Sequence, residues 1–181
     1  MPVLLFLLTL LCLPGSGIAA GLRAGTMAPE FELGDLDGNS HKLAELRKDG
    51  HVLLLFWSVN CHFCHKLIPE FKQLYDRYHG RGVELVAVNV GYESLHDVQH
   101  YAKDNELPYL ILNEDERKEE IIEAYGLIGT PTFVLVAPDG RIRSVSYQIP
   151  ALPAPRALPT PPPAPPADDA AEVPDAGEGE E

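Results

Sequence analysis

Short apolar runs alternate with amphipathic segments along the middle of this chain. Val52 to Phe56 is apolar on both faces, as in a central parallel strand that helices cover. Strands with similar patterns are predicted at residues 83–90, 109–112, 132–136 and 142–147, and the last pairs antiparallel with the one before it. Between the strands, apolar residues recur at helical spacing. This pattern indicates an α/β fold with a mixed central sheet flanked by helices.

Local signals mark where the predicted helices begin. Ser94 and Asp97 have the spacing of a capping box, and Asn113 with Glu116 repeats it. Asn60 is the expected N-cap of the helix that follows the first strand. Two further elements are predicted ahead of that strand: an N-terminal β-hairpin at residues 28–39 and a short helix at 43–47.

Cys61 and Cys64 stand between the first strand and the first long helix, in a C-x-x-C-H sequence completed by His65. A redox dithiol and the attachment site of a c-type haem both fit this pattern. At a helix N-terminus a cysteine is favoured as the thiolate, because unpaired N–H groups and the helix dipole stabilise negative charge there. We therefore expect Cys61 to attack a partner disulfide, and Cys64, more buried, to resolve the mixed disulfide.

The two ends of the chain differ in composition from the middle. Residues 1–20 have the layout of a secretory signal peptide without Lys or Arg at its start, and an uncleaved membrane anchor is the alternative. Residues 149–181 contain 10 of the 17 prolines and predict a disordered Pro/Ala-rich acidic tail. The domain between them, residues 21–148, keeps one cysteine pair, which suits a compartment where disulfides persist. We expect an extracytoplasmic protein, periplasmic or secreted, that meets a membrane only if residues 1–20 are retained.

The charge of the chain limits its partners. The formal net charge is −13, of which residues 21–147 carry −7. An acidic domain without a basic patch argues against binding to nucleic acid.

Several short segments match one family at its usual spacing. They are Ala28-Pro29-Glu30-Phe31, Leu36-Asp37-Gly38, Phe56-Trp57 with the two cysteines, Pro69, Tyr125-Gly126, Gly129 to Phe133, and Asp139-Gly140. On these residues the chain resembles the thioredoxin superfamily, and within it the extracytoplasmic TlpA-like and ResA-like thiol-disulfide oxidoreductases, with a redoxin or AhpC/TSA-like domain. The resemblance covers about residues 25 to 147.

The resemblance implies a thioredoxin-like fold and a set of site residues. It implies that Pro131 is cis, and that Thr130 and Pro131 lie against the cysteines and pair with the substrate backbone. Trp57 would shield the pair, and His62 and Phe63 would meet the substrate. The implied partners are protein thiols or disulfides and a redox partner protein, with a role such as cytochrome c biogenesis. No cofactor and no metal are expected.

Three residues depart from the family pattern. Phe63 replaces the usual proline before the second cysteine, and Leu55 and Leu67 replace carboxylates of thioredoxins and of ResA-like proteins. We hypothesise that the dithiol is more oxidising than that of a thioredoxin, because a cationic histidine beside Cys61 would stabilise the reduced form. The family's final helix is also replaced by the proline-rich tail, so one face of the sheet is either less covered or covered by another element.

Other functions fit parts of the sequence. A haem on the cysteines would leave the apolar strands and Thr130-Pro131 unexplained. Copper or another soft metal could use the cysteines with His62 and His65, although neighbours on a helix do not share a face. A peroxiredoxin would need Pro and Thr where Leu54 and Ser58 stand. A non-catalytic binding module that keeps the fold is a further alternative.

Overall fold

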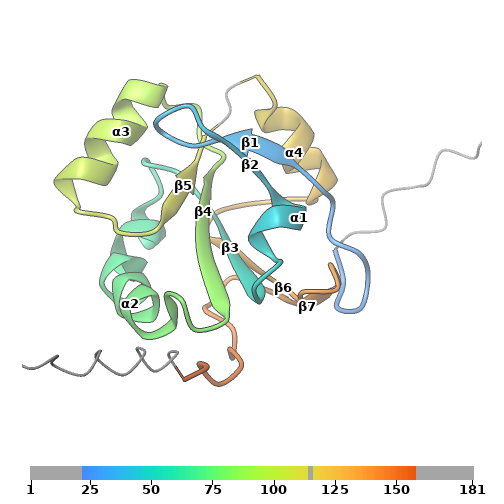
Figure 1. The fold of residues 1–181 in the computed structure, drawn as a ribbon. Helices are drawn as coiled ribbons and strands as arrows, with labels where there is room; N and C mark the ends of the chain where they lie inside the picture. The colour runs from blue at the N-terminus through green and yellow to red at the C-terminus, as the bar shows by residue number, and fades with distance from the viewer. Residues whose placement is uncertain (1–21, 114–115, 158–181) are drawn as a thin grey trace, which may run out of the picture.

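A computed structural model describes residues 22–113 and 116–157 of the chain (Figure 1). Five strands form one mixed sheet in the order β5-β4-β3-β6-β7. Its strands are β3 (His51–Trp57), β4 (Val83–Asn89), β5 (Leu110–Leu112), β6 (Thr132–Val136) and β7 (Ile142–Ser146). β4 is parallel to both β3 and β5, whereas β6 is antiparallel to β3 and β7 is antiparallel to β6. The predicted central strand and the predicted final hairpin are confirmed.

Helices cover both faces of the sheet, as Figure 1 shows. They are α1 (Leu43–Leu46), α2 (His62–Tyr78), α3 (Leu95–Asp104) and α4 (Lys118–Ala124). Alternate residues of β3 enter different cores: Leu54 packs with residues of α1 and α4, and Leu55 packs with residues of α2 and α3. β3 is therefore buried on both faces, which explains its unbroken apolar run.

The N-terminal hairpin consists of β1 (Glu32–Gly34) and β2 (Ser40–Lys42), which pair antiparallel. Asp35 closes its turn, because one carboxylate oxygen accepts hydrogen bonds from the backbone N–H of Asp37 and of Asn39, at 2.9 and 2.8 Å. This architecture confirms the predicted α/β fold with a mixed central sheet and an N-terminal hairpin. In the described part of the chain, no helix follows β7.

The two predicted capping boxes have different outcomes. The box at Ser94 and Asp97 is present and begins α3. The prediction at Asn113 is wrong, because α4 begins at Lys118 after Arg117. The backbone N–H of Asn113 instead donates to the carbonyl of Gly34 at 2.9 Å, which joins the end of β5 to the hairpin. The same local signal thus marks a helix start in one place and a tertiary contact in the other.

Residues 149–157, which composition assigns to the tail, lie against the domain. Ile149 and Leu152 are partly buried against the core beneath α2 and α3. Arg156 donates from its backbone N–H to the carbonyl of Arg81 and from Nη1 to the carbonyl of Asp49, each at 2.8 Å. This segment therefore covers part of one face of the sheet. It is the other element that the sequence allowed for in place of the family's final helix.

The predicted signal peptide at residues 1–20 and the remainder of the predicted tail lie outside the described residues. Across residues 22–113 and 116–157, no helix combines the length and the apolar content that crossing a membrane requires.

Candidate functional site

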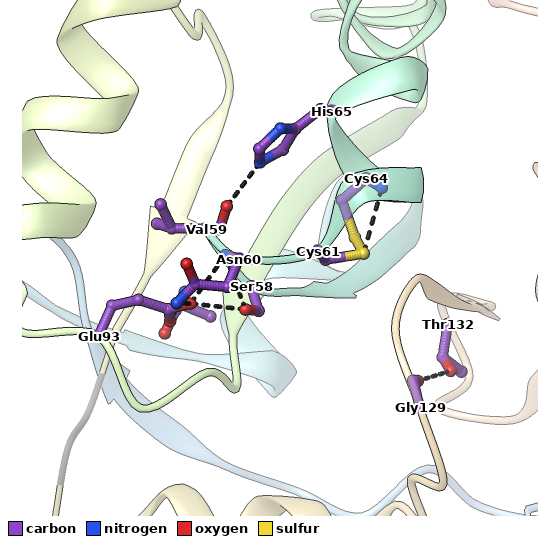
Figure 2. Close-up of a disulfide and its surroundings, with 10 residues drawn as sticks. Ser58, Val59, Asn60, Cys61, Cys64, His65, Glu93, Gly129 and Thr132 are labelled. Atoms are coloured by element: carbon purple, nitrogen blue, oxygen red, sulfur yellow. Dashed lines mark hydrogen bonds between the residues drawn. A yellow bond between two sulfur atoms is a disulfide. The ribbon is translucent and has the colours of Figure 1, made fainter.

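Cys61 and Cys64 form a disulfide where β3 ends and α2 begins (Figure 2). Cys64 is only 4% exposed, whereas Cys61 is partly exposed. The N-cap of α2 is Cys61, whose Sγ accepts a hydrogen bond from the backbone N–H of Cys64 at 3.1 Å. The prediction of Asn60 as N-cap is therefore wrong. The sulfur of Cys61, rather than the amide oxygen of Asn60, accepts the hydrogen bond from the first turn of α2.

The inner side of the disulfide is apolar. Trp57 is 4% exposed and lies in the same buried cluster as Cys64. Its ring packs against that of Tyr101 with 5.5 Å between centroids. Leu55 and Leu67, which replace two carboxylates of the family, belong to the same cluster. These neighbours disfavour a charge on Cys64 Sγ and leave Cys61 as the more accessible sulfur.

The loop before β6 lies at the same edge of the sheet as the cysteines. The Thr130–Pro131 peptide bond is cis, which confirms the expectation from the family resemblance. Thr132 pairs with Phe56, so the register places Pro131 beside the end of β3. The Thr132 hydroxyl donates to the carbonyl of Gly129 at 2.6 Å and closes this turn (Figure 2).

His62 and Phe63 lie at the outer surface of the first turn of α2. Both side chains are exposed, Phe63 by 67%. Their ring centroids are 6.0 Å apart, and Nζ of Lys66 lies 5.8 Å from the centroid of Phe63. The residue that replaces the family's proline therefore presents a large apolar surface to solvent next to the disulfide.

His65 is held by other contacts. Its Nε2 donates to the carbonyl of Val59 at 2.5 Å, and its ring lies 5.2 Å from that of Tyr101. Because a carbonyl only accepts, Nε2 carries a proton in this arrangement. His65 thus fastens the loop ahead of Cys61 to α2, as Figure 2 shows.

Glu93, in the loop between β4 and α3, is a site residue that the sequence reasoning missed. Although only 8% exposed, its carboxylate accepts hydrogen bonds from three groups of the loop ahead of Cys61. The donors to Oε1 are the Ser58 hydroxyl at 2.6 Å, the Asn60 backbone N–H at 2.9 Å and Asn60 Nδ2 at 3.0 Å. A buried carboxylate therefore holds the backbone immediately before the cysteine that we expect to react.

The environment of Glu93 favours its charged form. Burial acts to raise the pKa of the carboxyl, but hydrogen bonds from Ser58, Asn60 and Asn89 outweigh it and hold the pKa below its usual value. Gly91 makes room for this arrangement, since a Cβ there would lie 1.9 Å from Oε2 of Glu93. One feature of the sequence could have identified Glu93. It follows a predicted strand parallel to β3, and the loops after parallel strands lie at the same edge of the sheet.

A five-stranded sheet with a cysteine pair at a helix entrance and a nearby cis-proline defines a thioredoxin-like protein. Residues 24–145 match the AhpC/TSA family, and this chain belongs to that family. It is 35% identical over 124 residues to the thiol-disulfide oxidoreductase ResA of Geobacillus thermodenitrificans, an alignment that spans 68% of this chain and 69% of that protein. The ResA of Bacillus subtilis is 33% identical over 146 residues, with 77% and 79% covered.

Solved structures agree with this assignment. The thioredoxin domain of a thiol-disulfide oxidoreductase from Bacteroides vulgatus superposes with a TM-score of 0.64 at 25% identity, over 69% of this chain and 89% of that one. A thiol:disulfide interchange protein from Bacteroides sp. superposes with a TM-score of 0.62 at 26% identity, over 72% and 84%. The chain is thus a thiol-disulfide oxidoreductase of the thioredoxin-like class, and protein thiols or disulfides are its class of substrate.

Proposed function

We propose that this protein exchanges disulfides with partner proteins outside the cytoplasm, with Cys61 as nucleophile and Cys64 as resolving thiol. The supporting observation is the difference between the two sulfurs at the start of α2. Cys61 is partly exposed at the N-cap, whereas Cys64 is 4% exposed in an apolar cluster. An attacking thiol has to reach its partner, and a resolving thiol has to reach only the neighbouring sulfur.

The exchange has two steps. In the reduced protein, the Cys61 thiolate attacks one sulfur of a partner disulfide, so that a bond forms between the proteins and the other partner sulfur leaves as a thiolate. The Cys64 thiolate then attacks Cys61 Sγ, which restores the Cys61–Cys64 disulfide and releases the second partner thiolate. Two electrons pass from the dithiol to the partner, and each step runs in reverse when the partner is the reductant.

The start of α2 favours the charged form of Cys61. First-turn N–H groups of a helix have no intrahelical acceptor, and the helix dipole adds positive potential at this end. The Cys64 N–H already lies 3.1 Å from Cys61 Sγ in the disulfide form. The same donor would stabilise a thiolate on Cys61 after reduction.

Substrate would dock over the rim of this site. Thr130 and Pro131 stand at the sheet edge beside β3, where a partner backbone could pair with the loop. Phe63, in the first turn of α2, and Ile128, in the loop before β6, are 67% and 87% exposed. Large exposed apolar side chains often mark contact surfaces, so they would contact apolar residues beside the partner's cysteine. His62 would meet the same segment, and Trp57 would close the inner side.

The location and the partners are proposed from the sequence. A signal peptide at residues 1–20 would export the domain, and an uncleaved segment would tether it to the membrane. The relatives named ResA are thiol-disulfide oxidoreductases. The family resemblance suggests cysteines of apocytochromes or of copper sites as substrates, kept reduced through a redox partner protein.

Trapping the mixed disulfide tests the mechanism. A Cys64→Ser variant expressed in the native host should accumulate partners joined to Cys61, because the resolving thiol is gone. The double variant Cys61→Ser with Cys64→Ser serves as the control and should trap none. Equal capture by the two variants, or capture through Cys64 alone in a Cys61→Ser variant, would contradict the assigned roles.

The reduction potential tests how the pair is tuned. We propose a potential above the roughly −270 mV of thioredoxin, because exposed His62 adjoins Cys61 and would stabilise its thiolate when protonated. Equilibration with glutathione buffers measures the potential. A matched His62→Gln variant should have a lower potential, and a wild-type value at or below that of thioredoxin would contradict the proposal.

A further inference from the structure

Two histidines share one exposed face of α3. His96 and His100 stand four residues apart, and their ring centroids are 6.3 Å apart. Their side chains are 83% and 66% exposed, so neither ring is needed for the core. Two histidines at this helical spacing can bind one metal ion together, as in metalloprotease helices.

Carboxylates stand beside both rings. Nδ1 of His100 lies 2.8 Å from Oδ2 of Asp104, one helical turn further along α3. Nδ1 of His96 lies 3.9 Å from Oδ1 of Asp97. The carboxylate of Asp104 is therefore placed to favour a proton on Nδ1 of His100, which leaves Nε2 of that ring to bind a metal ion. A carboxylate in this place is the usual outer shell of a metal-binding histidine.

The pair borders an open hollow of about 510 Å³ next to the active-site loop. Both histidines line it together with Asp97, Asp104 and Asn60, the residue before Cys61. A cation would therefore find two imidazoles and negative charge at one place.

His65 provides an internal comparison. Like His62, it lies in the first turn of α2, but its Nε2 donates to Val59 and its ring packs on Tyr101. That nitrogen is already used, so His62 and His65 cannot both offer Nε2 to one metal ion.

We propose that His96 and His100 form a two-imidazole site for a divalent transition metal on α3, separate from the dithiol. Imidazole suits Cu²⁺, Ni²⁺ and Zn²⁺, and Cu²⁺ binds most tightly of the three in the general affinity order. Among the described residues, no three His, Cys, Asp or Glu side chains are gathered to hold an ion. Water therefore completes the coordination, and the site is accessible and exchangeable.

Metal titration of the oxidised protein tests this site. The disulfide removes both thiolates as ligands, and an untagged chain avoids added histidines. Calorimetric titration with CuCl₂ and with NiCl₂ should show one ion bound per chain. Both His96→Ala and His100→Ala should weaken binding by at least about tenfold, the loss that an outer-shell change alone typically causes.

A matched variant supplies the control. His79→Ala removes another exposed histidine, which stacks on Tyr75 at the far end of α2, and should leave the affinity unchanged. Asp104→Asn should weaken binding by less than loss of His100 does, because only the outer shell changes. Equal affinities for the wild type, His96→Ala and His100→Ala would overturn the proposal, and so would an equal loss in His79→Ala. Unchanged far-ultraviolet circular dichroism would show that the exposed substitutions preserve α3.

Discussion

Helices α2 and α3 begin at the same edge of the sheet but are capped by different chemistry. Each follows a strand of the parallel pair β3 and β4. In α3, the Ser94 hydroxyl accepts from the Asp97 N–H at 3.2 Å, and the Asp97 carboxylate accepts from the Ser94 N–H at 3.3 Å. In α2, a sulfur of the disulfide accepts from the Cys64 N–H at 3.1 Å.

The difference shows how one backbone geometry serves two purposes. The box in α3 satisfies N–H groups permanently and contributes to stability. The cap in α2 is an atom that gains charge when the disulfide is reduced, so the same N–H groups would stabilise a thiolate. Glu93 in turn holds the loop ahead of this sulfur cap from the side of α3.

Replacing the sulfur cap by a hydroxyl should have the largest effect. Cys61→Ser gives α2 the kind of cap that α3 has, since serine is a good N-cap, but it removes the proposed nucleophile. Reaction of the reduced protein with a small disulfide, followed in a stopped-flow instrument, should slow by at least about 10³-fold, as for loss of a nucleophile in other enzymes.

Cys64→Ser is the matched control, because it should still complete the first step and stop at the mixed disulfide. The unfolding free energy of Cys61→Ser should remain close to that of the reduced wild type. Fast mixed-disulfide formation by the Cys61→Ser variant would show that the two sulfurs are not distinguished as the caps suggest.

The next largest effect should come from removing Glu93, which connects the loop before α3 to the loop ahead of Cys61, and it should appear in the free energy of unfolding. Glu93→Ala removes the acceptor of the Ser58 hydroxyl and of Asn60 Nδ2, and leaves the Asn60 N–H only the Ser58 oxygen at 3.1 Å. A hydrogen bond to a charged group contributes about 1.5–3 kcal/mol. We expect urea unfolding to show a loss of about 2–3 kcal/mol. Glu93→Gln keeps one oxygen acceptor and should lose less. Equal losses of unfolding free energy in Glu93→Ala and Glu93→Gln would show that the hydrogen bonds to the carboxylate are not the source of this stability.

The charge of Glu93 should also appear in the pH dependence of stability. Its pKa in the folded protein lies below the ordinary value of 4.5, because the hydrogen bonds outweigh burial. A carboxyl with a depressed folded pKa adds stability above its unfolded pKa, and that contribution is lost as the pH falls through the folded pKa. The stability difference between wild type and Glu93→Gln should therefore be full at neutral pH and shrink below about pH 4.5. Thermal unfolding measured across that range checks this, and a difference that grows toward acid would refute the sign.

The smallest effect is expected from a change to Ser94, because the cap of α3 is purely structural. Ser94→Ala should cost about 1 kcal/mol, the usual value of an N-cap side chain. The rate of exchange and the reduction potential should stay at wild-type values, because α3 carries no sulfur. Ser94→Asn, which can still cap, serves as the control. A change in potential with Ser94→Ala would show that the two helix starts are coupled beyond the loop that Glu93 holds.

Sequence reasoning succeeded where the determining contacts are local. The capping box of Ser94 and Asp97 needs only residues three apart, and the apolar run of β3 reflects burial on both faces. It failed where a distant partner competes for the same groups. Asn60 has the side chain of an N-cap, but Glu93, 33 positions along the chain, binds both its amide and its N–H. Asn113 begins a capping pattern, yet its N–H is taken by Gly34 of the hairpin.

The sequence by itself determined the α/β class, the central strand and the cysteine pair at a helix entrance, because periodicity and spacing within one segment encode them. Only the tertiary structure decided what surrounds the pair. Neighbouring parallel strands bring their carboxyl ends together, and this places Glu93 against the loop before Cys61. The same folding lays residues 149–157 along the face beneath α2 and α3. Such contacts depend on which segments meet in space, and no local pattern of residues specifies that meeting.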